Sequence, residues 1–392
     1  MKLSKRVVAL AESATLAVSA KAAKMKADGV DVVSFGAGEP DFDTPVHIRQ
    51  AAIEALNTGQ TKYPNPASGI AVARKAVCDS LVRDAKLRYA PEQVIITSGG
   101  KDAAYLAFHA LLDPGDEVII PKPYWVSYPE MVRLAEGTPV FVAGPERSDY
   151  KLTPELLRAA ITPRTRIFVF NSPSNPSGVT YHPDEVRALA TVLQERDIIV
   201  FADEIYDRLL YAGQKSMSYA AVSDKAFAQT LTCNSASKTY AMPGWRLGYA
   251  AGPTEIIKAM AKLQSQSTSG AATFSQIAYA AALTDSQACV ESMRGEFERR
   301  AAHMWKRLTA ISGVRCPRPT GAFYCFPNVS SHYARLGVND STQFAGKLLE
   351  SAKVAVVPGG AFGLDQHVRL SFAASMQTID KGLDRIQAFL AP

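Results

Sequence analysis

Short apolar segments alternate with longer segments of helical period between residues 90 and 250. Seven of the short segments are predicted strands, at residues 94–97, 117–120, 139–142, 166–170, 198–202, 230–232 and 247–251. Several of the intervening segments have the length of a helix, among them 101–112 and 183–196. Because parallel strands need long crossover connections that are usually helical, this alternation predicts an α/β fold in which helices cover both faces of a mostly parallel sheet.

The C-terminal part of the chain has a different pattern. Residues 286–311 contain no proline and many charges at a helical period, so we expect a long connecting helix there. Predicted strands at 322–326, 354–357 and 368–372 and a final helix at 378–390 follow it and indicate a smaller α+β domain. No internal repeat or low-complexity segment is visible. We therefore expect two domains, the larger of which spans residues 46–285.

The charge distribution argues against nucleic-acid binding. The 392 residues are 47% hydrophobic and 20% charged, with a formal net charge of +6. Lys and Arg are interspersed with Asp and Glu and form no basic block, which favours a small anionic ligand over a polyanion. No segment approaches the roughly 20 apolar residues of a membrane span, so no membrane partner is expected.

The cysteines indicate neither a disulfide framework nor a metal site. They are odd in number, widely spaced and without a C-x-x-C pair: Cys78, Cys233, Cys289, Cys316 and Cys325. This pattern fits a reducing cytosol. The apolar run at residues 7–10 is too short for the core of a signal peptide. A cytoplasmic location is therefore expected.

Lys238 stands in the segment S-A-S-K-T-Y-A-M-P-G-W-R-L-G-Y, directly after a predicted strand. A lysine that forms a Schiff base must be held near a cofactor carbonyl, and a phosphate on that cofactor must be bound by donors on the same loop. Ser235, Ser237 and Arg246 supply such donors. The alternative is a solvated lysine on an ordinary loop punctuated by glycine and proline.

Polar side chains also follow two other predicted strands. Asp203 directly follows the strand at 198–202, and Asn175 lies in the turn N-S-P-S-N-P-S-G after the strand at 166–170. Ligands of open α/β sheets bind beyond the carboxyl ends of the strands, which makes both residues site candidates. The alternatives are that Asp203 caps a helix and that Asn175 only initiates a turn. Tyr206 is either a third site residue or a half-buried packing tyrosine.

The segment T-S-G-G-K at residues 97–101 joins a predicted strand to a predicted helix. Small residues there let backbone N–H groups approach a phosphate at the positive end of the helix, although many Gly-Gly pairs are only turns. Gly99 and Gly100 are therefore candidates for a phosphate cup. A second glycine pair, at Gly36 and Gly38, lacks the third glycine of a dinucleotide fingerprint, which disfavours a nicotinamide dehydrogenase.

Three further residues have both a structural and a functional interpretation. Trp125, in P-Y-W-V-S-Y, is either a packing residue or a stacking partner for a flat pyridinium ring. Arg369 alternates with apolar neighbours on a predicted strand, so it either faces solvent or offers a guanidinium fork to a carboxylate. Lys101 places a cation in the first turn of a helix, where the macrodipole opposes it. It is either a tolerated surface residue or a ligand of an anion.

The strings S-x-S-K-x(7)-R-x-G-Y, N-P-S-G and P-Y-W-V-S-Y together resemble class I pyridoxal-phosphate-dependent aminotransferases, in particular the aspartate aminotransferase branch called subgroup beta. Matching strings run in order from residues 13–15 through 37–45, 61–63, 114–117, 202–206 and 321–324 to Arg369. The resemblance implies fold type I of the pyridoxal-phosphate-dependent transferases. It also implies that residues 1–45 join 286–392 in the small domain, and that the protein is a homodimer with shared active sites.

By this resemblance, Lys238 carries the cofactor and moves the substrate's α-proton, and Asp203 keeps the cofactor's ring nitrogen protonated. Asn175 and Tyr206 would donate to its phenolic oxygen. The remaining implied cofactor contacts are Gly99, Gly100, Lys101, Trp125, Ser235, Ser237 and Arg246, with Tyr63 reaching the cofactor of the partner subunit. The implied substrate contacts are Arg369, Gly38 and Asn175 for the α-carboxylate, and Lys101, Ser13 and Thr15 for a distal carboxylate. Trp125 is also implied to contact the substrate.

The implied activity is transfer of the amino group of L-aspartate to 2-oxoglutarate by a ping-pong route. One alternative is a related transaminase for aromatic, alanine-like or prephenate substrates, or a C–S lyase. Relatives that use prephenate tend to carry a basic residue before the Ser-Ala-Thr string, where this chain has Ala11 and Glu12. Another alternative is a non-catalytic pyridoxal-phosphate-dependent regulator, which is poorly supported because no helix-turn-helix segment precedes the fold.

Overall fold

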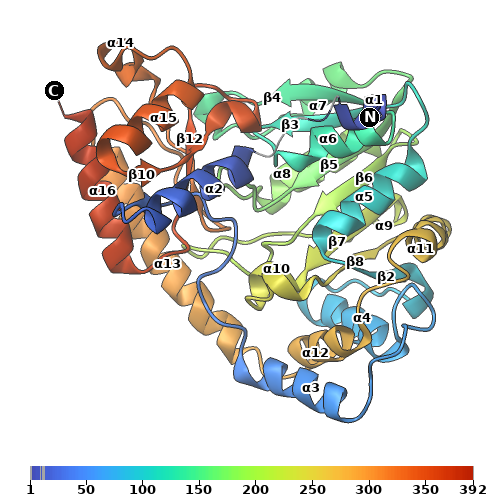
Figure 1. The fold of residues 1–392 in the computed structure, drawn as a ribbon. Coiled ribbons are helices and arrows are strands. Elements are labelled where there is room, and N and C mark those ends of the chain that lie inside the picture. Colours follow the sequence, from blue (N-terminus) through green and yellow to red (C-terminus); the bar gives the residue numbers. More distant parts are fainter. Residues whose placement is uncertain (1, 9, 11–13, 392) are drawn as a thin grey trace.

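A computed structural model describes residues 2–8, 10 and 14–391 and shows two lobes (Figure 1). The large lobe contains a seven-stranded sheet in the order β2-β8-β7-β6-β5-β3-β4. Its strands are β2 (Val94–Thr97), β3 (Glu117–Lys122), β4 (Thr138–Ala143), β5 (Thr165–Asn171), β6 (Ile199–Asp203), β7 (Thr230–Ser235) and β8 (Gly248–Ala251). Within this sheet β8 runs opposite to the other six strands, and it pairs antiparallel with β2 and β7. The prediction of a mostly parallel sheet is confirmed.

Helices cover both faces of the sheet, as predicted (Figure 1). Successive side chains of β2 point to opposite faces of the sheet. Ile96 packs with α4 and α12 on one face, and Ile95 packs with α5 and α11 on the other. The helices of this lobe are α3 (Val46–Asn57), α4 (Ala71–Ala85), α5 (Gly100–Leu111), α6 (Ser127–Leu134), α7 (Pro154–Ala160), α8 (Pro183–Leu193), α9 (Asp224–Gln229), α10 (Ala236–Thr239), α11 (Thr254–Ser267) and α12 (Thr273–Thr284).

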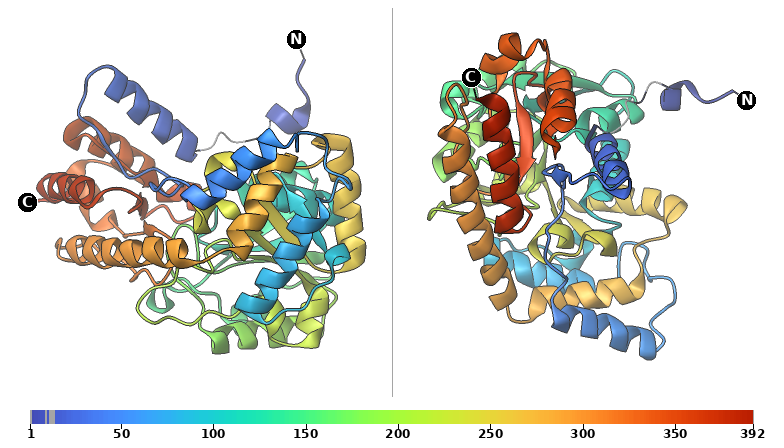
Figure 2. Two further views of the ribbon diagram at one scale, coloured as in Figure 1. Left: turned by 90° about the horizontal axis from the view of Figure 1, so that it is seen from below. Right: turned by 60° about the vertical axis from the view of Figure 1, so that its left-hand side comes forward.

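The small lobe is built on two small sheets. Strand β1 (Val33–Ser34) pairs with β10 (Val354–Ala355), and β12 (Val368–Ser371) lies between β11 (Val357–Pro358) and β9 (Tyr324–Cys325). The prediction of a single strand at 354–357 is wrong, because this segment contributes to two strands, β10 and β11, that belong to different sheets. The helices are α2 (Ala14–Ala27), α13 (Ala288–Thr309), α14 (Tyr333–Leu336), α15 (Ser341–Ala352) and α16 (Met376–Leu390), while α1 (Lys5–Val8) stands apart near the N-terminus (Figure 2).

Helix α13 is the predicted connecting helix, and it runs alongside α16 (Figure 2). His303 on α13 lies 2.6 Å from Asp380 on α16, which ties the two helices together at the surface. None of the described helices combines the length and the apolar composition that a membrane crossing requires. The residue boundaries expected for the two domains stay a prediction.

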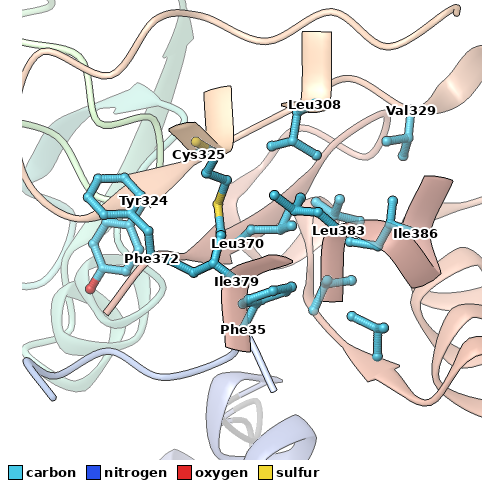
Figure 3. Packing of buried hydrophobic residues seen from close by; sticks show 14 of the residues in the cluster. Phe35, Leu308, Tyr324, Cys325, Val329, Leu370, Phe372, Ile379, Leu383 and Ile386 are labelled. Atoms are coloured by element: carbon cyan, nitrogen blue, oxygen red, sulfur yellow. The ribbon is translucent and has the colours of Figure 1, made fainter. Parts of the chain in front are cut away.

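The core of the small lobe explains how β12 presents its side chains. Leu370 and Phe372 point into an apolar cluster that also includes Phe35, Ile379 and Leu383 (Figure 3). Since successive side chains of a strand point to opposite faces, the residues between them point the other way. The interpretation that this opposite face is exposed to solvent is wrong, because it packs toward the large lobe and Arg369 is only 2% exposed.

Candidate active site

The carboxyl ends of the parallel strands meet at one edge of the sheet, and Trp125, Asn175, Asp203 and Lys238 lie at or after those ends. Gly38 and Arg369 come from the small lobe. Together the two lobes place eight of the predicted site residues in the wall of one cavity of about 180 Å³. These are Gly38, Lys101, Trp125, Asn175, Asp203, Tyr206, Lys238 and Arg369. A larger adjoining cavity shares the wall at Lys101 and is also lined by Arg246.

Lys238 is on the short helix α10 directly after β7, and its ammonium donates to the backbone carbonyl of Gly38 at 2.5 Å. Burial lowers the pKa of Lys238 to about 8, and the Arg369 and Arg246 cations add to the shift. Glu39 and Asp203 act in the opposite direction. A larger fraction of this amine is therefore neutral near pH 8 than for an ordinary lysine, which is the state that attacks a carbonyl. The interpretation as a solvated loop lysine is wrong.

Asp203 is the last residue of β6, and its carboxylate is buried. It accepts hydrogen bonds from the hydroxyl of Tyr128 and from the backbone N–H of Ile205 at 3.4 Å. Burial raises its pKa to about 6, although both hydrogen bonds oppose the shift. The residues after it form a turn and not a helix, so the helix-capping alternative is wrong. A cationic ring nitrogen would stabilise the ionised form of this carboxylate.

Glu204, which our sequence analysis did not select, is also buried beside the site. Its carboxylate accepts the backbone N–H of Tyr219 at 2.9 Å, and burial raises its pKa from 4.5 to about 8. Because the folded state holds this proton more tightly than the unfolded state, the stability contributed by Glu204 is complete below pH 4.5 and decreases as the pH rises toward 8.

We expect Glu204→Gln to remove this pH dependence. The free energy of unfolding of the unmodified protein should fall relative to that of Glu204→Gln between pH 4.5 and about 8, because only the unmodified side chain must ionise while buried. Urea unfolding at several pH values measures both proteins. Glu155→Gln is a control on the exposed surface of α7. A difference between Glu204→Gln and the unmodified protein that is constant with pH would contradict the prediction.

Arg369 is buried without a carboxylate partner among the residues that the structure describes. Its Nη1 donates to Asn175 Oδ1 and its Nη2 to the backbone carbonyl of Gly36, both at 3.0 Å. The guanidinium carbon lies 4.4 Å from the centroid of the Tyr324 ring, and Nε has no hydrogen-bond partner. A buried unpaired charge is costly, so this geometry favours binding of an anion.

The junction of β2 and α5 lets a ligand come close to the backbone. Gly99 has φ +94°, and a Cβ there would lie 2.5 Å from Arg246 Nη2. Arg246 Nη2 donates to the backbone carbonyl of Ser98 at 3.2 Å. The start of α5, at Gly100, offers unpaired N–H groups next to this guanidinium, which is the donor set that a phosphate requires.

The two predicted serine ligands are buried where β7 meets α10. Ser235 caps α10 by accepting the N–H of Ser237 at 3.1 Å, and its own hydroxyl lies 2.9 Å from the carbonyl of Leu247. The hydroxyl oxygens of Ser235 and Ser237 are 2.9 Å apart. These contacts hold the turn that carries Lys238, and contact of either hydroxyl with a phosphate stays a prediction.

Three aromatic contacts complete the cavity wall. Tyr206 is fully buried, and not half-buried, with its hydroxyl 3.0 Å from that of Tyr324. Trp125 is half-buried and meets Tyr128 edge to face at 5.1 Å. Lys101 is exposed, its ammonium lies 5.1 Å from the centroid of the Trp125 ring, and desolvation there together with the Arg246 cation lowers its pKa.

Tyr63 lies outside the cavity that contains Lys238. Tyr63 is 85% exposed on the segment after α3, and it lines neither of the two cavities. Ser13 and the side chain of Thr15 lie outside the described residues. The sequence analysis missed Tyr128 and Tyr324, although both stand in strings that carried the resemblance, P-Y-W-V-S-Y and G-A-F-Y.

Residues 30–386 match the family described as aminotransferase class I and II. The chain belongs to this family. It is 48% identical to the aspartate aminotransferase of Geobacillus stearothermophilus over 100% of this chain and 99% of that protein. It is 44% identical to the aspartate/prephenate aminotransferase of Nitrosomonas europaea over 100% of both. The solved structure of an aspartate aminotransferase from Thermus thermophilus with maleate has a TM-score of 0.94, 46% identity and 99% coverage of each chain.

The family uses pyridoxal phosphate, and this chain is a pyridoxal-phosphate-dependent aminotransferase of fold type I. The described residues fit the cofactor. Lys238 offers an amine with a lowered pKa, and Asp203 a buried carboxylate that a pyridinium cation would stabilise. Gly99 leaves room that a larger side chain would fill, beside the Arg246 guanidinium.

Proposed function

We propose that this chain moves the amino group of L-aspartate to 2-oxoglutarate. The observation that carries the proposal is the pair of cations in the wall of the Lys238 cavity, Arg369 and Lys101. Neither has an ion-pair partner within the part of the chain that the structure describes. An amino acid with two carboxylates complements both cations. The names of the Geobacillus and Thermus relatives support the same substrate.

The roles of the residues follow from their positions. Bound pyridoxal phosphate supplies an electron-withdrawing ring that stabilises negative charge at the substrate α-carbon. In the proposal, Arg369 binds the α-carboxylate and thereby directs the α-carbon toward Lys238, which takes the α-proton as general base and later returns a proton as general acid. Asp203 keeps the ring cationic, and Asn175 orients the Arg369 fork that it already contacts.

We also propose a homodimer in which Tyr63 contacts the partner subunit's cofactor phosphate. Exposed large apolar side chains on the two helices that flank Tyr63 in the sequence support this interface, because such side chains are often covered in an assembly. They are Val46, Ile53 and Leu56 on α3 and Val72 on α4. The cytoplasmic location also remains a proposal, supported by the pattern of cysteines in the sequence.

Half-reactions of the purified holoenzyme with a panel of amino acids test the substrate. We expect aspartate and glutamate to react faster than alanine and phenylalanine, since only the acidic substrates fill both cation positions. Prephenate belongs in the acceptor panel because the Nitrosomonas relative is named for it. A neutral amino acid that reacts faster than aspartate would contradict the proposed donor, and no reaction with any amino acid would favour the regulator.

Replacing Lys101 tests the distal carboxylate. A charge-assisted hydrogen bond contributes roughly 1.5 to 3 kcal/mol, so Lys101→Ala should lower kcat/KM for aspartate by about ten- to a hundredfold. The values of kcat/KM for the substrates alanine and phenylalanine should fall much less in this variant. Lys122→Ala is a matched control, because Lys122 also lies over an aromatic ring, 5.4 Å from Phe141, but outside the Lys238 cavity. Equal losses for acidic and neutral amino acids would show that Lys101 does not select the substrate.

A further inference from the structure

Two buried polar side chains lie on the same face of the chain at β12. His367 directly precedes the strand and Arg369 is its second residue, and each is 2% exposed. Residues two apart in an extended segment point to the same side, so His367 and Arg369 both lie opposite Val368 and Leu370, which pack in the apolar core of the small lobe.

The His367 ring is hydrogen-bonded across the two lobes. Its Nε2 lies 2.6 Å from the hydroxyl of Tyr150, and the two rings meet edge to face at 5.1 Å. Tyr150 belongs to the large lobe, in the segment between β4 and α7, where it has φ +62°. Burial lowers the pKa of His367 to about 4, so the ring is neutral at neutral pH and pairs with the phenol without an added charge.

A continuous stack of rings leads from His367 to Arg369. His367 stacks on Phe326, with centroids 4.8 Å apart and planes at 13°. Phe326 meets Phe362 edge to face at 5.8 Å, and the Phe362 ring lies 5.1 Å from the guanidinium carbon of Arg369. Each ring therefore limits the movement of the next, and the last one borders the guanidinium.

The backbone around this stack is also tied to the large lobe. The carbonyl of Phe362 accepts the N–H of Tyr124 at 3.2 Å, next to Trp125 in the wall of the active-site cavity. Gly363 has φ +85°, and a Cβ there would lie 2.7 Å from the Tyr124 ring. The two lobes thus meet closely on the side of Arg369 that carries Phe362.

We propose that Tyr150 and His367 are positioning residues, which hold the Arg369 guanidinium at the place where it receives the substrate α-carboxylate. The hydrogen bond fixes the His367 ring against the large lobe, and the ring stack and β12 pass this constraint to Arg369. Displacement of a binding group by about 1 Å is enough to reduce catalysis severely, so the constraint has a functional consequence. The inference rests on the proposed role of Arg369.

The test is the dissociation constant of succinate for the holoenzyme, since succinate has the two carboxylates of aspartate but no amino group to react. We expect Tyr150→Phe and His367→Phe each to raise the dissociation constant of succinate about tenfold. The double variant should be no weaker than either single one, because both substitutions remove the same hydrogen bond. His367→Gln, whose amide reaches the position of Nε2, should recover most of the affinity.

Arg315→Gln is the matched control. Arg315 also pairs across the lobes, with Glu146 at 3.0 Å, but its side chain is 70% exposed and makes no hydrogen bond to a member of the ring stack. It should change the succinate constant less than twofold. An equal loss in Arg315→Gln would overturn the inference, since general docking of the lobes would then explain the effect. Additive effects of Tyr150→Phe and His367→Phe would overturn it as well.

Thermal midpoints separate positioning from stability. A lower midpoint in Tyr150→Phe with unchanged succinate affinity would show that the hydrogen bond only stabilises the fold, and would overturn the inference. Arg369→Leu separates the inference from the function on which it rests. If Arg369→Leu binds succinate normally, the proposed function itself fails. If Arg369→Leu loses succinate while Tyr150→Phe does not, only the positioning role fails.

Discussion

Lys238→Ala should reduce transamination of aspartate by about ten-thousandfold, the largest effect that we expect from any single substitution. Two functions are lost together, the covalent attachment of the cofactor and the transfer of the α-proton. The half-buried setting of Lys238 supports both, because its lowered pKa of about 8 leaves a neutral amine available near physiological pH. Among the described residues, the other lysine that lines the cavity is Lys101, whose ammonium lies against Trp125.

The attachment can be measured directly. Borohydride reduction of the holoenzyme followed by peptide mass mapping should place the pyridoxyl group on Lys238, and Lys238→Ala should carry none. Lys101→Ala is the control, since it removes the other lysine of the same cavity and should leave the label in place. A label on any other lysine would contradict the assignment of Lys238.

Attachment should also depend on pH. Because burial lowers the pKa of Lys238 to about 8, the rate at which the cofactor attaches to the apoprotein should rise with pH up to about 8 and then level off. For an ordinary lysine the rise would continue toward its usual pKa of 10.5. Stopped-flow absorbance over this range distinguishes the two profiles.

The central sheet was predictable because its strands are short apolar segments separated by helix-length connections. Strand β2 begins and ends at the predicted residues, and the other six differ by a few residues at their ends. Most of these segments are buried on both faces, with β4 at the edge of the sheet as the exception, so local sequence and tertiary environment favour the same structure. The same topology then determines that residues after β3, β5, β6 and β7 meet at one edge.

The small lobe was less predictable because its strands depend on distant partners. The segment 354–357 was predicted as one strand, but Val354 pairs with Val33 and Val357 pairs with Arg369. Periodicity placed Arg369 on the face opposite the core, but it contained no sign that Tyr324 and Phe362 cover that face. The burial of a charge becomes visible only when the two lobes are brought together.

The hydrogen-bond partners within the site also could not be predicted from the sequence. Tyr128 donates to Asp203 over a separation of 75 residues, and Tyr206 and Tyr324 are paired over 118 residues. Each tyrosine could have been an ordinary packing residue. Only the family strings indicated their neighbourhood, and those strings did not indicate which groups would pair.

Asp203→Ala should slow abstraction of the α-proton by about a thousandfold, the second large effect that we expect. A carboxylate that is buried and has its pKa raised to about 6 gains strongly from a cationic neighbour, and it stabilises that cation in return. Alanine would remove this stabilisation, and the site would then no longer favour a proton on the ring nitrogen of the bound cofactor. The cofactor should still bind, because the donors near Gly99 and Arg246 are unchanged.

Asp207→Asn is the matched control for this experiment. Asp207 is also a carboxylate whose pKa burial raises to about 6, but it lines a separate cavity with Asp84 and Arg208. A solvent of deuterium oxide and α-deuterated aspartate isolate the proton-transfer step in single-turnover measurements. A rate for Asp203→Ala close to that of Asp207→Asn would contradict the role. A normal rate in Asp207→Asn beside a slow one in Asp203→Ala requires contact with the cofactor, because burial and a raised pKa are common to both carboxylates.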